Sequence, residues 1–192
     1  MLWRIGLRAL LVVACASALV AGASGQAVAA RTEPVGTNAF PAQWLDSGQR
    51  ISNFYSGKCL QPETNTSQAR VVQRTCTNGT NSLQRWKVLD AGDGHAMLRN
   101  GGGLCLDLFA NSQAEVVPGT PVQVFSCSNG YPTEHWSRSA GSRTDHFQVR
   151  THINGYCLDV HHRSTADGAP LQVFLCDYYE TAQQFRFVDA PW

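Results

Sequence analysis

Charged residues are scarce in this sequence of 192 residues. Asp, Glu, Lys and Arg together make up only 15% of it, and the formal net charge at pH 7 is +1. It has no cluster of Lys and Arg of the kind that binds nucleic acid, and no basic amphipathic helix that would lie on a membrane surface. The composition therefore gives no electrostatic indication of a nucleic-acid partner or a membrane surface.

Helix signals are missing as well. No window after Arg31 has the period of an amphipathic helix, whereas residues 121–126, 146–150 and 170–175 alternate apolar and polar side chains at period two. Glycine-rich stretches such as residues 100–103 separate these short segments. Many short strands with regular turns predict a closed all-β architecture.

The N-terminal segment has the order of a secretory signal. Arg4 and Arg8 are followed by an uncharged stretch up to Arg31, and Ala27-Val28-Ala29 offers the small residues of a cleavage site. We therefore predict a signal peptide at residues 1–30 and a secreted chain, followed by a linker or N-terminal strap at 31–49. The globular domain would then occupy residues 50–192.

Two other interpretations of this segment stay open. The uncharged run is long enough to span a bilayer as a retained anchor, although Gly22, Ser24 and Gly25 weaken it as a span. The residues before Cys15 resemble a bacterial lipoprotein box, which would make Cys15 a lipidated N-terminus. We favour the cleavable signal because the apolar run before Cys15 is very short and continues after it.

A threefold repeat organises the rest of the chain. Trp86 and Trp136 are 50 positions apart, and Phe185 follows Trp136 by 49. Three units of about fifty residues therefore fill the predicted domain. We expect the three aromatic residues to belong to the core of the fold, since large aromatic side chains dominate protein interiors.

The repeat also selects a disulfide pattern. One of the seven cysteines, Cys15, lies in the predicted signal, and the remaining six form an even set in a chain predicted to be secreted. Six cysteines allow fifteen pairings, of which only one treats the three units alike. The predicted bridges are Cys59–Cys76, Cys105–Cys127 and Cys157–Cys176.

The motifs of the third unit resemble the ricin B-type lectin domain. The unit reads Cys157-Leu158-Asp159, then Gly168-Ala169-Pro170-Leu171-Gln172-Val173-Phe174-Leu175-Cys176, then Gln183-Gln184-Phe185. The second unit repeats this order, and a degraded copy stands in the first. The resemblance covers about residues 50–190. It implies a β-trefoil of three pseudo-repeats with one disulfide each, and a protein that binds glycans or polysaccharide without a cofactor.

The same resemblance implies which residues bind sugar. In the family, an Asp after Cys-Leu, a Gln four residues before the second Cys, an aromatic residue two before it, and a polar pair near the Gln-x-aromatic motif form the site. A carboxylate accepts hydroxyl hydrogen bonds, an amide both donates and accepts, and a ring covers the apolar face of a sugar. The matching residues are Asp107, Gln123, Phe125 and Glu134 in the second unit, and Asp159, Gln172, Phe174 and Gln183 in the third.

The sequence departs from the family pattern in several places. Gln61, Val72 and Arg74 replace the Asp, Gln and aromatic residue in the first unit, so we expect no sugar site there. In the third unit, Ala182 stands where the family usually has Asn, which removes one hydroxyl contact. Both remaining units carry Phe rather than Trp, which reduces the stacking surface.

Catalysis and metal binding are not indicated. His161 and His162 are adjacent, which on an extended segment directs them to opposite faces, and we expect no metal site. No nucleophile signature is present, and the repeat places Asp107 and Asp159 in separate units rather than as a catalytic pair. We predict a non-catalytic secreted lectin, and the family resemblance implies galactose-type sugars or plant and microbial polysaccharides as its ligands. The alternatives are the receptor-binding subunit of a secreted multi-chain toxin, with a partner chain, and a small secreted hydrolase.

Overall fold

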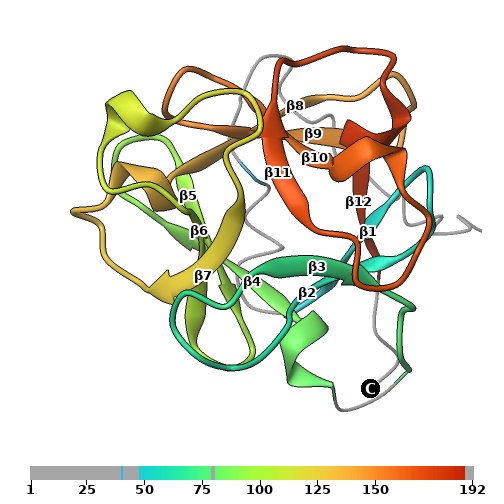
Figure 1. Cartoon of the computed structure of the whole chain (residues 1–192), viewed down its shortest axis with the longest axis horizontal. Coiled ribbons are helices and arrows are strands. Elements are labelled where there is room, and N and C mark those ends of the chain that lie inside the picture. Colours follow the sequence, from blue (N-terminus) through green and yellow to red (C-terminus); the bar gives the residue numbers. More distant parts are fainter. Residues whose placement is uncertain (1–39, 41–47, 79–80, 189–192) are drawn as a thin grey trace, which may run out of the picture. The chain divides into compact units, whose positions relative to one another are not determined.

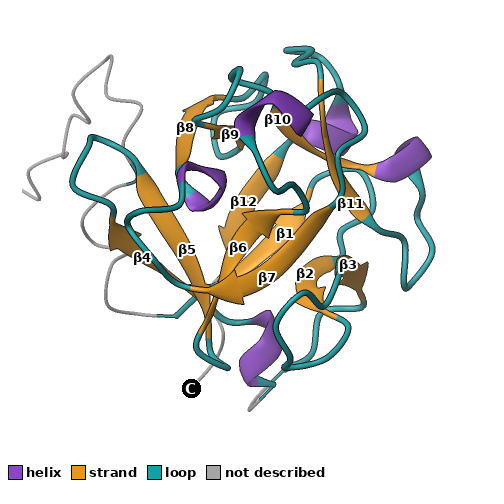
Figure 2. Ribbon diagram, turned by 60° about the vertical axis from the view of Figure 1, so that its left-hand side comes forward, coloured by secondary structure: helices purple, strands orange, loops and turns teal. Residues whose placement is uncertain are grey.

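The computed structural model describes residues 40, 48–78 and 81–188. These residues form twelve short strands and short 3-10 helices, and no α-helix occurs among them (Figure 2). No described helix is long and apolar enough to cross a membrane. The strands are β1 (Arg50–Asn53), β2 (Cys59–Pro62), β3 (Val71–Arg74), β4 (Trp86–Asp90), β5 (Ala96–Asn100), β6 (Leu104–Leu108), β7 (Val122–Ser126), β8 (Trp136–Ala140), β9 (Phe147–Thr151), β10 (Cys157–Val160), β11 (Leu171–Phe174) and β12 (Phe185–Val188).

Six of the strands pair in a closed antiparallel ring. β1 pairs with β12, β12 with β9, β9 with β8, β8 with β5, and β5 with β4. The ring closes where Gln49, just before β1, exchanges two backbone hydrogen bonds with Trp86 at the start of β4, at 2.9 and 2.8 Å. Closure leaves no free strand edge within this ring.

The other six strands form three hairpins, β2–β3, β6–β7 and β10–β11. Backbone bridges join each hairpin to the next, at Arg70 with Gln123, Pro121 with Gln172, and Pro170 with Val72. Figure 1 shows β3, β7 and β11 arranged around a common centre. The ring with its three hairpins is a β-trefoil, so the predicted all-β fold of three units is confirmed.

Each hairpin carries one disulfide. The bridges Cys59–Cys76, Cys105–Cys127 and Cys157–Cys176 join the first strand of a hairpin to the end of its second strand, as predicted. Their cysteines are 17, 22 and 19 positions apart. Loops of this size contribute about 3 kcal/mol each when only chain entropy is considered.

The core contains the predicted repeat aromatics. Trp86, Trp136 and Phe185 have no exposed surface. The indole N–H of Trp86 donates to the carbonyl of Leu60 at 3.0 Å, and that of Trp136 donates to the carbonyl of Leu106 at 2.9 Å. These bonds tie the β2–β3 and β6–β7 hairpins to the ring and leave neither indole nitrogen unsatisfied.

Several predictions concern the N-terminal part of the chain. The predicted signal at 1–30, with Cys15, lies outside the described residues, and so does most of the predicted strap at 31–49. Phe40 from that segment is described and buried, and its ring lies 6.1 Å from that of Phe147 and 6.2 Å from that of Phe187. Phe40 therefore adds to the core beside β9 and β12.

Candidate functional site

The hairpin of the second unit brings Asp107 and Gln123 together. Asp107 lies on β6 directly opposite Gln123 on β7. The Nε2 atom of Gln123 donates to Oδ2 of Asp107 at 2.6 Å, and both side chains are largely buried. Strand pairing places facing side chains on the same side of the sheet, so this register fixes the carboxylate and the amide as a pair.

A cavity of about 380 Å³ lies above this pair. The rings of Phe125 and Tyr131 stand on its wall with centroids 6.2 Å apart and planes at 67°. Tyr131 is 48% exposed. The cavity thus joins a charged hydrogen-bonding base to an aromatic wall. Its other lining residues include Gln68, Asn111, Gln113 and Thr133.

Burial also affects the pKa of the carboxyl group at the base of the cavity. Removal from water raises the pKa of Asp107, and the hydrogen bonds from the side chains of Thr133 and Gln123 oppose this rise by favouring the charged form. A sugar hydroxyl that donated to the same carboxylate would favour the charged form further. The base of the cavity is therefore electrostatically suited to hydroxyl donors.

Glu134 lies behind this cavity rather than in it. It has no exposed surface, and its Oε2 atom accepts from the backbone N–H of Ser128 at 2.8 Å. Gln84 and Gln183 accept the equivalent bonds from Thr77 and Asp177, each at 2.9 Å. The three residues hold the segment that follows each disulfide. The predicted contact of Glu134 with sugar stays a prediction, and its burial favours this supporting position instead.

The carboxyl group of Glu134 lacks the donor that the other two units have. In the first unit, Nε2 of Gln84 donates to Gln61 and to the carbonyl of Thr75, at 2.9 and 3.0 Å. The corresponding Oε1 of Glu134 is buried without a partner. Burial, with the nearby charge of Asp107, raises the pKa of Glu134 to about 7. A proton on Glu134 supplies the missing donor.

The third unit repeats the arrangement on β10 and β11. Asp159 lies opposite Gln172, whose Nε2 atom donates to Oδ1 of Asp159 at 2.9 Å. These side chains line a cavity of about 640 Å³ together with Phe174, which is 43% exposed. Burial raises the pKa of Asp159, against the hydrogen bonds of Gln172 and Gln183. Gln183 lines the cavity as well, although its amide also bonds the backbone at Leu175 and Asp177.

The first unit has the same backbone without the same chemistry. Gln61 lies opposite Val72 on the β2–β3 hairpin, and its Oε1 atom accepts from Gln84 and from Asn81, at 2.9 and 3.3 Å. Arg74 at the aromatic position is exposed. This hairpin therefore offers neither a carboxylate nor a ring, and the predicted lack of a sugar site there stays a prediction.

Some cavity residues were not predicted. Tyr131 and Thr133 come from the loop between Cys127 and Trp136, where no periodicity indicates which side chains face the cavity. Gln68 reaches the second-unit cavity from the first unit, with a φ of 68°. In the third-unit cavity the corresponding residue is Gly119, with a φ of 97°. The second unit therefore has a side chain where the third has none.

Comparison with known proteins relates the fold of the chain to a family of lectin domains. Residues 47–185 match the family model of the ricin-type beta-trefoil lectin domain. A search of characterised protein sequences returned no significant match.

Several solved structures share the fold. The designed threefold symmetric protein ThreeFoil is 28% identical over 73% of this chain and 97% of its own, with a TM-score of 0.65. An exo-beta-1,3-galactanase from Clostridium thermocellum is 27% identical over 74% of this chain, which covers 30% of that enzyme, with a TM-score of 0.65. A ricin B-like lectin from Macrolepiota procera, solved in complex with lactose, is 19% identical over 76% of this chain and 97% of its own, with a TM-score of 0.61.

Proposed function

The chain belongs to the ricin-type β-trefoil lectin domain family, and from this premise we propose that it is a non-catalytic lectin with glycan pockets in its second and third units. The observation that carries the proposal is the pairing of Asp107 with Gln123 under an aromatic wall, repeated by Asp159 and Gln172. The pair recurs in two units and is absent from the first, where the strands are the same.

The chemistry of each pocket suits a sugar ring. The carboxylate accepts hydrogen bonds from adjacent hydroxyl groups, and such charge-assisted bonds are the stronger kind. The neighbouring Gln amide already bonds this carboxylate, which holds both groups in place before a ligand arrives. Preorganisation of this kind reduces the entropy lost on binding.

The aromatic wall supplies the second part of recognition. The C–H face of a pyranose packs on a ring, and Phe125 with Tyr131 offers two rings in the second unit. In the third unit, Phe174 is the aromatic residue that lines the cavity. We therefore expect the second-unit pocket to bind more tightly. Shallow single pockets of this kind have dissociation constants of about 0.1–1 mM, or about 4–5.5 kcal/mol.

Galactose-containing glycans are the ligand class that we propose to test first. The lectin from Macrolepiota procera was solved with lactose, and the enzyme from Clostridium thermocellum is an exo-beta-1,3-galactanase. Both names concern galactosides, and the shared fold covers 97% of the lectin but only 30% of the enzyme. They support the ligand class only as a starting point, because the chain is less than a third identical to either.

The hydrolase alternative rests on one specific observation. Asp107 and Glu134 lie close enough for the charge of Asp107 to raise the pKa of Glu134, as in a general acid paired with a carboxylate. However, Glu134 has no exposed surface and therefore cannot reach a glycosidic oxygen. We expect purified protein to show no turnover of galactosides. Turnover that Glu134→Gln abolished would establish the hydrolase instead.

Secretion is part of the proposal. Three disulfides are typical of proteins that mature in an oxidising compartment. We expect the mature chain to appear outside the cell with its N-terminus at residue 30 or 31. N-terminal sequencing of the secreted protein would test this. A first residue at the lipidated Cys15, or an uncleaved chain in the membrane fraction, would contradict it.

The toxin-subunit alternative requires a second secreted chain. Purification of the protein from its native source would test it, because a receptor-binding subunit would co-purify with a catalytic chain in fixed proportion. The lectin proposal expects the protein to be isolated alone and to bind glycans in that state.

The direct test is a glycan array followed by titration calorimetry with the best ligand. We expect Asp107→Asn and Asp159→Asn each to remove one class of site, because the amide keeps the shape of the carboxylate and loses its charge. Gln61→Ala, at the equivalent position of the first unit, is the matched control and should leave binding unchanged. If both Asp variants bound like the wild type while remaining folded by circular dichroism, the assigned pockets would be wrong.

A further inference from the structure

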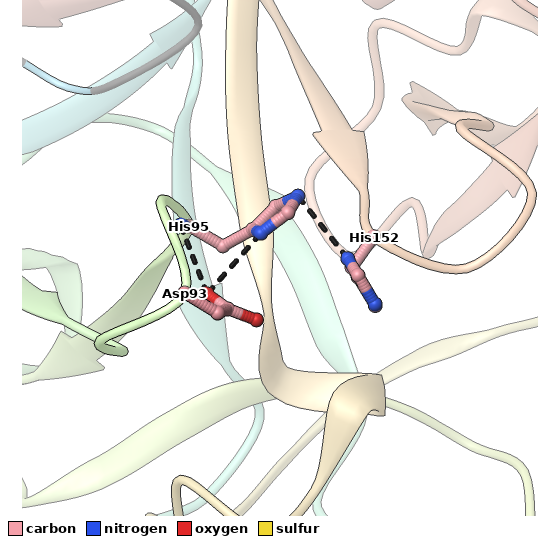
Figure 3. Close-up of side chains that lie close together, drawn as sticks. All are labelled: Asp93, His95 and His152. Carbon is pink, nitrogen blue, oxygen red and sulfur yellow. Dashed lines mark hydrogen bonds and ion pairs between the residues drawn. The ribbon is translucent and has the colours of Figure 1, made fainter.

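Three metal-ligating side chains gather where the turn between β4 and β5 meets the segment after β9, and none of them lines either sugar cavity. Asp93 and His95 stand on the turn between β4 and β5, and His152 follows β9 (Figure 3). One ligand atom from each residue lies within 4.8 Å of the other two. The ring nitrogens His152 Nδ1 and His95 Nε2 face each other at 3.1 Å, and His95 Nδ1 lies 3.2 Å from Asp93 Oδ1.

A further histidine holds this group from behind. His135 is almost fully buried, and its Nδ1 atom lies 2.9 Å from Oδ2 of Asp93. The backbone ties the same segments together, since the N–H of His152 donates to the carbonyl of His135 at 2.8 Å. The N–H of His95 donates to Oδ1 of Asp93 at 3.0 Å. Three segments that are separate in the sequence, at residues 93–95, 135 and 152, are thereby fixed around one small volume.

The threefold repeat provides an internal comparison. The backbone hydrogen bond from His152 to His135 has an equivalent at each of the other two repeats of this position in the trefoil, both at 2.8 Å. These equivalents run from Gly101 to Arg85 and from Phe54 to Gln184. The fold therefore forms the same junction without histidine at either position. Because the backbone does not require these imidazoles, their meeting at one junction of three needs another explanation.

We propose that Asp93, His95 and His152 bind a divalent transition-metal ion, with Zn²⁺ as the representative. Imidazole and carboxylate are ligands that such ions prefer. Zinc–nitrogen bonds of about 2.0–2.1 Å in tetrahedral geometry separate two ligand nitrogens by about 3.3 Å, close to the 3.1 Å between His95 and His152. Asp93 and His152 are exposed and His95 is partly exposed, so an ion can enter from solvent.

This arrangement has consequences for the chemistry of the site. Three protein ligands leave at least one position of a tetrahedral ion open to water or to a group on a partner molecule. His135 fixes the Asp93 carboxylate through a hydrogen bond, which is the kind of support that tunes affinity in metal sites. The adjacent His161 and His162 line the third-unit cavity and do not belong to this group.

The test is a calorimetric titration of the metal-stripped mature protein with Zn²⁺. We expect one ion per chain, and a loss of affinity of about tenfold or more in either His95→Ala or His152→Ala. Co²⁺ titration adds a spectroscopic readout, because the visible absorption of the bound ion reports its coordination. His135→Gln, which introduces the residue found at the equivalent position 184, should retain one ion per chain with weaker binding and an altered Co²⁺ spectrum.

His161→Ala together with His162→Ala is the matched control for binding by any surface histidine pair, and it should bind Zn²⁺ as the wild type does. Circular dichroism of every variant checks that the fold is kept. If Zn²⁺ does not bind, if His95→Ala and His152→Ala bind it unchanged, or if the control loses it equally, the proposal is overturned. Glycan binding by Asp107→Asn is an independent measurement, so failure of either proposal leaves the other testable.

Discussion

Glu134 is a residue at which the second unit differs from the other two, which have Gln84 and Gln183 at the equivalent position. The position requires a donor toward the hairpin, which Gln84 supplies in the first unit, and a carboxylate cannot donate. Full burial and the nearby Asp107 charge raise the pKa of Glu134 to about 7, so the group is mostly protonated below neutral pH and about half protonated at pH 7. A protonated Glu134 offers one O–H donor beside its acceptor oxygen, and so supplies one of the two donors of the glutamine amide found at this position in the first unit.

This raised pKa predicts how stability depends on pH. Between its usual value of 4.5 and about 7, Glu134 keeps in the folded state a proton that the unfolded chain releases. The free energy of unfolding therefore falls as pH rises through this window, by on the order of 2 kcal/mol, and levels off above it. Denaturant titrations from pH 4 to 9 would measure this fall. Glu134→Gln should lack it, and Gln84→Glu should gain a second one; equal profiles for all three proteins would refute the explanation.

Gln68 is a second single residue at which the second-unit cavity differs from the third, and its backbone conformation is unusual. Its φ of 68° is a left-handed conformation that disfavours residues with a Cβ atom, and the corresponding residue at the next hairpin is Gly119, with a φ of 97°. Gln68 nevertheless lines the second-unit cavity. We infer that the side chain is kept for the ligand rather than for the fold.

Replacing Gln68 by glycine, and Gly119 by a residue with a Cβ atom, tests that inference. Gln68→Gly should leave the free energy of unfolding within about 1 kcal/mol of the wild type, because relief of strain offsets the greater entropy of the unfolded chain. It should also change the glycan affinity of the second-unit pocket. Gly119→Ala should lower stability by about 1–2 kcal/mol for backbone reasons alone, since no atom lies within 4 Å of an added Cβ. Chemical denaturation and calorimetry would separate the two effects.

At the scale of elements, the hairpins position the sites. Alternation in residues 121–126, 146–150 and 170–175 predicted strands that form as β7, β9 and β11. The repeat also predicted which residues of a hairpin share a site, since each Asp stands two residues after its cysteine. The cavity walls did not follow, because Tyr131 and Thr133 lie in a loop whose side-chain directions depend on tertiary packing. The cluster of Asp93, His95 and His152 was missed because His152 lies 57 positions from His95, so no short motif joins all three residues.

The disulfides belong to this scale as well. Removal of the Cys105–Cys127 bridge by a double Ser substitution should lower stability by about 3 kcal/mol. It should also weaken the second-unit pocket more than the third, because Tyr131, which lines the second-unit pocket, lies four residues after Cys127. Thermal denaturation and glycan titration of this variant, compared with the equivalent Cys157–Cys176 variant, would measure both effects. Equal losses in both pockets would contradict the local role of the bridge.

At the scale of the whole molecule, the trefoil holds two different pockets on one rigid body. Asp107 and Asp159 lie on separate hairpins, β6 and β10, that share the same central ring. A glycan surface that engages both pockets gains affinity without new contacts, because the second binding event becomes intramolecular.

Bivalency predicts different behaviour on soluble and immobilised glycans. Asp159→Asn should leave the affinity of the remaining pocket for a free disaccharide unchanged, and should lower retention on a dense glycan surface by about a hundredfold. Calorimetry and surface plasmon resonance would provide the two numbers. Equal effects in both assays would mean that the pockets act one at a time.

The most direct test of the whole account is a crystal structure of the mature protein soaked with a β-galactoside such as lactose. The account predicts sugar density over the Asp107–Gln123 pair, with its ring against Phe125 and Tyr131, and none over Gln61 in the first unit. Sugar bound only at another surface, with Asp107 and Asp159 free of ligand, would contradict it.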